Sequence, residues 1–314
     1  MRFLIFVTMV RNRVLLFGLT LIVSATFAQE DFSDVMEEPE FIENVFSGTR
    51  VINGHSTETL EKNELEFRIE HRFGDMLPNW DASNLAQSWL GFDQAADIRF
   101  GFEYGITDNI MIGIGRSKGS GAPYRSLLDG FAKYRILRQK SEGMPISLTA
   151  LGTVGFSYMK ASDDLSQVSS FPNWQHRFGY SAQLNVSRKF GSWLSLSLSP
   201  TLVHRNYVAA DDKNTLFALG GAARFSITKK MGVIIEYFHA FRGEPIHFFD
   251  RNNPNTFRNS LGIAFEFETF GHNFTINLTN SKGFGDVQYI PYTFSDWMNG
   301  EFRLGFSIGR KFSF

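Results

Sequence analysis

Apolar and polar side chains alternate along most of the chain after residue 62, which is the two-residue period of a β-strand with two different faces. In the segment 63–73, one face is apolar. The other face carries an unbroken charged series: Glu64, Glu66, Arg68, Glu70 and Arg72. A soluble sandwich seldom carries such a series on the face that meets water. The pattern therefore favours a barrel with lipid on its apolar side and a polar lumen.

Repeated alternation predicts twelve strands, and apart from a short helix near Ala82–Leu90 we find no long segment of helical period. The strands are expected near 63–73, 97–106, 110–116, 127–138, 145–159, 176–190, 193–205, 214–227, 231–242, 257–268, 272–281 and 299–314. Long and short connections alternate between them. The predicted fold class is all-β: a transmembrane antiparallel β-barrel of about 12 strands, with short periplasmic turns and long external loops.

Pro200 disagrees with this pattern because it falls inside the seventh predicted strand. A closed barrel has no edge at which a missing backbone donor is tolerated. We interpret Pro200 as the site of a bulge, and the alternative is that the strand ends there.

Residues 1–28 have the features of a cleaved signal peptide. Arg11 and Arg13 precede an apolar stretch from Val14 to Val23, and small residues lead to a cleavage point after Ala28. A retained anchor helix is the alternative, which the two arginines disfavour. No later run of about 18 apolar residues follows, so we expect no transmembrane helix.

The remaining chain divides into an acidic periplasmic N-terminal segment, 29–61, and the outer-membrane barrel, 62–314. Within the first, residues 44–61 combine Val51 and Ile52 with two glycines just before the first strand. We hypothesise that they fold into the periplasmic mouth as a partial plug. A flexible lead-in to the barrel is the equally weighted alternative.

Composition removes several function classes. The 314 residues include 34 Phe but no Cys, which excludes disulfides, thiolate nucleophiles and Cys-ligated metals. The net charge of -1 gives no electrostatic case for nucleic acid as a partner.

Catalytic and metal-binding patterns are weak. None of the seven histidines is followed by Ser two residues later, as a lipid-facing phospholipase pair requires, and none forms a His-x-His pair. Acidic pairs at 163–164 and 211–212 lie near His176 and His204 in sequence, as a rim protease would need, but paired acids in loops are usually solvated surface. We expect no enzyme, no catalytic residue, no metal site and no cofactor.

The inward face is the main functional candidate because it carries both charge signs in near balance. The candidate lumen-lining residues are Glu64, Glu66, Arg68, Glu70, Arg72, Asp97, Arg99, Glu103, Lys133, Arg135, Arg177, Lys189, Arg224, Glu236, Arg242, Arg258, Glu266 and Arg303. One interpretation is a self-satisfied core of ion pairs. The other is a narrow path whose charge ladders select small polar or zwitterionic solutes.

Cations also gather at the outer ends of the predicted strands. A belt that would contact lipopolysaccharide phosphates comprises His71, Arg116, Arg125, His204 and His239. Snorkelling charges at the loop bases are the ordinary alternative. The chain ends on Phe314, an ending that resembles the strand signature read by the barrel assembly machinery.

Several stretches resemble an outer-membrane β-barrel family common in Bacteroidota, domain of unknown function 5777. They are Gly48–Ser56, Glu64–Ile69, His71–Gly74, Glu103–Asp108, Lys133–Arg135, Pro200–Asn206 and Leu278–Ser281. The resemblance covers nearly the whole chain after residue 45 and implies fold and location, but no catalytic residue. If Pro200 belongs to the family pattern, it also favours a bulge over a broken strand.

The sequence therefore predicts a barrel in the outer membrane of a Gram-negative bacterium, most simply a narrow channel or transporter for small polar solutes. The alternative is a non-conducting structural or docking barrel that binds a partner through its loops or periplasmic tail. The expected partners are outer-membrane lipid, lipopolysaccharide and the assembly machinery, and a periplasmic protein is a further candidate.

Overall fold

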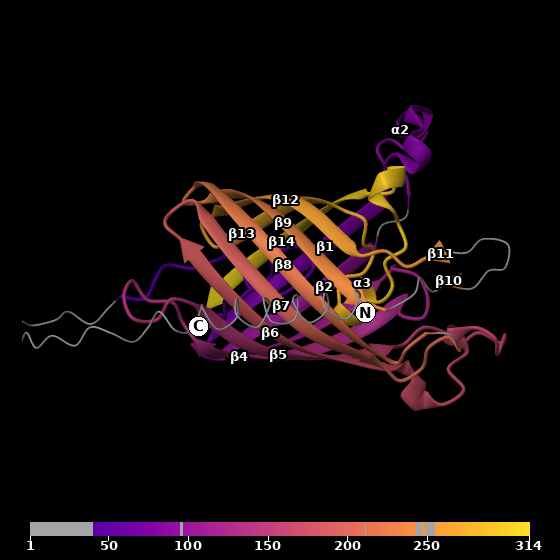
Figure 1. Ribbon diagram of the computed structural model, residues 1–314, viewed down its shortest axis with the longest axis horizontal. Coiled ribbons are helices and arrows are strands. Elements are labelled where there is room, and N and C mark those ends of the chain that lie inside the picture. Colours follow the sequence, from indigo (N-terminus) through magenta and orange to yellow (C-terminus); the bar gives the residue numbers. More distant parts are fainter. Residues whose placement is uncertain (1–39, 95–96, 211, 243–246, 249–254) are drawn as a thin grey trace, which may run out of the picture.

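The computed structural model describes residues 40–94, 97–210, 212–242, 247–248 and 255–314. The predicted signal peptide and residues 29–39 of the predicted acidic N-terminal segment lie outside these residues. Twelve strands form a closed barrel in which sequence neighbours pair and β1 closes onto β14 (Figure 1). The barrel strands are β1 (Glu64–Asp75), β2 (Asp97–Thr107), β3 (Ile110–Lys118), β4 (Ser126–Leu137), β5 (Ser147–Ser157), β6 (Phe178–Phe190), β7 (Leu194–Arg205), β8 (Thr215–Thr228), β9 (Met231–Phe241), β12 (Ser260–Thr269), β13 (His272–Thr279) and β14 (Arg303–Ser313).

All twelve predicted strands are present, and the predicted fold class is confirmed. Closure runs from Glu64 opposite Ser313 to Arg72 opposite Gly305. It is physically required because an open edge in hydrocarbon would leave backbone groups without partners, at several kcal/mol each. Every pairing is antiparallel, so both ends of the barrel domain lie at the same end of the cylinder.

The bulge predicted at Pro200 is wrong, and so is its alternative, because β7 runs through this residue in one register. Pro200 is paired with Leu219 of β8. On the other side, the pairing of β7 with β6 skips only Leu184 and Asn185 and resumes in the same register. The missing N–H thus interrupts one short stretch of the hydrogen-bond ladder, but β7 contains no extra residue of the kind that defines a bulge.

The connections follow the predicted alternation with one exception. The connection 138–146 belongs to the short-turn end but is longer than 119–125 at the other end. Its residue Lys140 forms a bridge with Phe41, and Gln139 accepts a backbone hydrogen bond from Ile42. This turn is therefore extended because it pairs with the chain that enters the barrel.

The long connections carry the remaining elements, which cluster around the right-hand end of the barrel in Figure 1. They are η2 (Pro78–Trp80), α2 (Ala82–Gln87), η3 (Val168–Ser170), η4 (Trp174–Arg177), α3 (Asp286–Tyr289), η5 (Trp297–Asn299) and the small pair β10 (His247–Phe248) with β11 (Asn255–Thr256). The helix expected near Ala82–Leu90 is present as α2. Among the described residues, no helix has the length and apolar content needed to span a bilayer.

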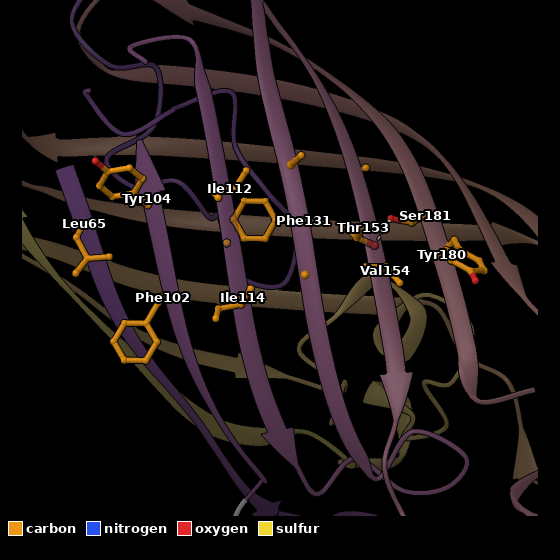
Figure 2. A pocket seen from close by; sticks show the side chains of 14 residues that line it. Leu65, Phe102, Tyr104, Ile112, Ile114, Phe131, Thr153, Val154, Tyr180 and Ser181 are labelled. Atoms are coloured by element: carbon orange, nitrogen blue, oxygen red, sulfur yellow. Dashed lines mark hydrogen bonds between the residues drawn. The ribbon is translucent and has the colours of Figure 1, made fainter. Parts of the chain in front are cut away.

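Lipid-facing side chains cover the outside, as expected from the alternation. The outer surface includes an apolar depression of about 780 Å³, where Gly130, Ala132 and Gly152 lie between larger neighbours such as Phe102 and Tyr180 (Figure 2). Small residues in adjacent strands cause it, because Ala132 is paired with Gly152. It lies on the face that meets hydrocarbon, so lipid chains suffice to cover it.

Candidate functional site: the filled lumen

The predicted lumen residues fall into two groups according to their burial. Twelve of them are buried inside the barrel: Glu66, Arg68, Glu70, Arg72, Arg99, Glu103, Lys133, Arg135, Arg224, Glu236, Glu266 and Arg303. Six lie at strand ends or in connections and are only partly buried: Glu64, Asp97, Arg177, Lys189, Arg242 and Arg258. The structure therefore brings twelve of the predicted residues together inside the lumen and leaves the other six nearer the two mouths.

Ion pairs join wall residues of neighbouring strands and of strands one further apart. Arg99 is fully buried; its guanidinium lies 2.7 Å from Glu70 Oε2 and 2.6 Å from Asp129 Oδ2. Arg224 pairs with Glu266 in the same way on the opposite wall. Burying single charges would be very costly, so these pairs are the arrangement that a charged lumen requires.

A hairpin from the N-terminal side fills the lumen between these walls. We call residues 44–60 the N-terminal insert. Its turn is closed by a hydrogen bond from Val51 N–H to Gly54 O at 2.9 Å, and the bridge between Arg50 and His55 continues the hairpin. This is the stretch that the sequence singled out by its glycines and its turn-forming residues.

Wall charges hold the insert through its backbone. Glu236 of β9 accepts hydrogen bonds from the backbone N–H groups of Ile52, Asn53 and Gly54, at 3.1, 2.8 and 3.0 Å. Lys133 of β4 donates to three insert carbonyls, those of Thr49, Ser56 and Glu58, at 2.9, 3.1 and 2.9 Å. Hydrogen bonds to charged groups contribute about 1.5–3 kcal/mol each.

Side chains of the insert also find partners on the wall. Glu103 accepts a hydrogen bond from Thr49 Oγ1 at 2.7 Å and pairs with Arg50 at 3.2 Å. Apolar insert residues pack on small apolar patches of the wall, in one cluster of Val45, Phe46, Val51, Ile52, Ile234 and Ala264. The insert therefore acts as a core for a barrel that is otherwise polar inside.

A second segment enters from the external end, and the sequence analysis missed it. We call residues 281–295 the loop insert; it contains α3. Its buried apolar side chains include Phe284, Val287, Tyr289 and Ile290. The only sequence signal was the high apolar content of a connection assigned to an external loop.

Asp286 anchors the loop insert. It accepts hydrogen bonds from Ser181 Oγ at 2.5 Å and from the Tyr289 hydroxyl at 2.8 Å. Burial raises the pKa of Asp286 above its usual range and raises that of Tyr289 as well. The phenol therefore stays protonated and keeps its donor role.

The two inserts meet at Arg72 of β1. This side chain donates to Asn53 Oδ1 of the N-terminal insert and to the carbonyl oxygens of Ser281, at 3.1 Å, and of Gly283. Its guanidinium also lies over the Phe284 ring. Beside His55, between the inserts and the wall, a cavity of about 20 Å³ has room for about one water. In the described part of the chain, the middle of the lumen is thus filled from both ends.

The predicted belt residues lie on four different strands and in the connection 119–125. His71 stacks on Phe306 at 5.2 Å, and Arg116 lies over the Tyr158 ring. His204 contacts Thr215, His239 contacts Asn259, and Arg125 is exposed in the connection 119–125. Contact with lipopolysaccharide stays a prediction. So does recognition of Phe314, which is 83% exposed at the end of the chain.

The loop acids considered for a protease have other partners. Asp212 pairs with Arg205 at 2.7 Å and with Arg242 at 2.8 Å rather than with a histidine. Asp164 accepts hydrogen bonds from Ser166 and Gln167 within its own turn. Within the described residues, no three His, Asp or Glu side chains gather to form a metal site.

Together these features define an integral membrane β-barrel with an apolar outside and a filled, charged lumen. The chain belongs to the family described as "Membrane bound beta barrel domain (DUF5777)", which matches residues 46–312. A closed transmembrane barrel of this kind resides in the outer membrane.

The chain is similar, at low sequence identity, to several solved structures. The KdgM porin has a TM-score of 0.45 at 8% identity, covering 80% of this chain and 99% of that chain. An outer membrane channel from Pseudomonas putida F1 has a TM-score of 0.46 at 13% identity, covering 82% and 98%. LpxR from Salmonella typhimurium has a TM-score of 0.35 at 10% identity, covering 80% and 100%. No curated protein matches the sequence.

Proposed function

We propose that this barrel is a narrow channel for small polar solutes. In its resting state the channel is closed, and the N-terminal insert is the plug that closes it. The observation that carries this proposal is the way the insert is held. Glu236, Lys133 and Glu103 bind it by hydrogen bonds and ion pairs, and water can replace such partners when the insert leaves. The exposed wall would then present alternating charges and hydroxyl groups to a solute.

The second candidate is the non-conducting docking barrel. The filling of the lumen from both ends favours it, because no conducting path is needed if the barrel only presents loops or a periplasmic tail to a partner. The two candidates differ in one measurable property, namely whether releasing the insert produces conductance.

A disulfide lock tests the channel proposal. Thr57 of the insert and Ser187 of β6 have side-chain oxygens 2.5 Å apart, and the chain has no native Cys that could mispair. In the double variant Thr57→Cys/Ser187→Cys, we expect single-channel openings in a planar bilayer only after reduction. The oxidised form should stay silent because the insert is tied to the wall.

A matched pair controls for the disulfide itself. Ser199 and Asn185 face each other on β7 and β6, with Oγ and Oδ1 2.7 Å apart, and neither is in the insert. Ser199→Cys/Asn185→Cys should open equally when oxidised and reduced. Equal openings of the locked variant in both redox states would show that the insert does not close the channel. No openings from the wild type and the reduced variants alike would refute the channel and favour the docking barrel.

A further inference from the structure

A hollow of about 640 Å³ lies at the external end of the barrel. It is formed between the connections 119–125 and 158–177 and the start of the loop insert. Four exposed cationic side chains line it: Lys118, Arg125, Lys160 and Lys282. They come from four different parts of the chain, so the fold gathers them.

These four cations differ from those of the lumen in their partners. Among the described residues, none of the four takes part in a salt bridge, whereas the buried lumen cation Arg99 pairs with two carboxylates. The one acid in the lining, Asp97, is half-buried and accepts a hydrogen bond from Ser120 N–H at 2.7 Å. It faces several positive charges, Lys282 among them. The hollow therefore carries a clear excess of positive charge, which attracts anions.

The other side chains that line the hollow indicate which kind of molecule would bear the bound anionic group. Hydroxyl and amide side chains from Ser120, Ser162, Gln167 and Ser169 lie among the cations. Among the described residues, no aromatic ring lines the hollow, so a nucleobase would find no stacking platform there. The volume suits a small-molecule ligand.

We propose that this hollow is a binding site for a saccharide that carries phosphate or carboxylate groups. The cations bind the anionic oxygens and the hydroxyl and amide groups bind the sugar hydroxyls. Ile98 and Lys118 end the lipid-facing rows of β2 and β3, so two sources of this chemistry can reach it: the head group of a lipopolysaccharide molecule and a free acidic saccharide. The site does not depend on whether the barrel conducts.

Calorimetry on the full chain in lipopolysaccharide-free detergent micelles tests the site, with glucose 6-phosphate as the probe and maltose as the neutral comparison. The variant Lys118→Gln/Arg125→Gln/Lys160→Gln/Lys282→Gln should bind glucose 6-phosphate at least about tenfold more weakly. Because all four side chains are exposed, the fold should persist, which circular dichroism checks. The control Lys229→Gln/Lys230→Gln removes two exposed cations at the short-turn end and should bind as wild type does.

Competition distinguishes the two sources. Phosphorylated lipopolysaccharide that displaces glucose 6-phosphate, while its dephosphorylated form does not, identifies the head group. No displacement by either form identifies a free saccharide, and both results support the site. Affinity within twofold of wild type in the quadruple variant, equal affinity for maltose, or no binding of glucose 6-phosphate would overturn the proposal.

Discussion

At the scale of single residues, Gly105 shows how closely the end of the N-terminal insert and the residue that follows it, Glu61, pass the wall. A Cβ at this position would lie 1.9 Å from the carbonyl oxygen of Glu61 and 3.0 Å from that of Leu60. Both are backbone atoms, so no change of rotamer can make room. Gly152 on the lipid side is the opposite case, because a Cβ there meets nothing within 4 Å.

Gly105→Ala should therefore displace the base of the insert while leaving the barrel closed. Arg50 in the insert is 6% exposed, and its peptide bond should become a site of tryptic cleavage as the hairpin loosens. We expect cleavage after Arg50 to accelerate about tenfold, measured by mass spectrometry of the digest. Gly152→Ala is the matched control. Equal cleavage rates in both variants would show that the insert tolerates the added methyl group.

Side-chain alternation was enough to predict which residues point inward in the middle of a strand, as Glu66, Arg68 and Glu103 do. It could not tell how far each strand extends into the lumen, so Arg258 and Lys189 were grouped with buried wall residues although they lie at the mouths. Lys189 contacts the carbonyls of Glu43 and Asn44 at the periplasmic mouth. The period of a strand carries no information on depth along the barrel axis.

At the scale of elements, the two inserts are connected through one side chain. Arg72 bonds to Asn53 in the N-terminal insert and to backbone carbonyls on both sides of Lys282 in the loop insert. Lys133, in contrast, bonds only to the N-terminal insert. Substitutions of Arg72 and Lys133 can therefore be compared: Arg72 contacts both inserts, whereas Lys133 contacts only one.

Hydrogen exchange should resolve this difference. Arg72→Met removes the donor to an amide oxygen of the N-terminal insert and to two carbonyls of the loop insert. Backbone amides in 49–56 and in 281–289 should therefore exchange about tenfold faster, which corresponds to a loss of about 1.4 kcal/mol in local stability. Lys133→Met should accelerate only 49–56. The measurement is mass spectrometry of peptides from both regions. Loosening of a single insert in Arg72→Met would contradict the connection.

The strands were predictable as elements because each repeats its pattern over eight or more residues, whereas the loop insert was not. Residues 281–295 have no two-residue period, and α3 is only four residues long. Their apolar side chains are buried because Phe238 and Val203 of the wall, together with Tyr124 of the connection 119–125, offer a cluster at the external end of the lumen. That contact is set by the closed barrel and has no local signature.

At the scale of the whole molecule, the distribution of side chains is inverted relative to a soluble protein. Large apolar side chains such as Phe102 and Ile114 are exposed, while Arg99, Arg205 and Arg303 are among the most buried. The lipid replaces water as the outer solvent, and the polar interior must satisfy itself. The N-terminal insert contributes one Arg and one Glu to this interior, so its departure leaves the charge balance of the wall unchanged.

Ion selectivity follows from that balance. With the insert released, the pore wall would present both signs in near equality, so potassium and chloride should permeate within about twofold of each other. The measurement is the reversal potential of the reduced Thr57→Cys/Ser187→Cys variant under a potassium chloride gradient. Adding Arg135→Gln removes one inward cation, which pairs with Glu58 at 3.5 Å while the insert is in place, and should shift the preference towards potassium. Strong anion preference in the parent pore would mean that the wall's arginines, rather than its balanced pairs, determine what passes.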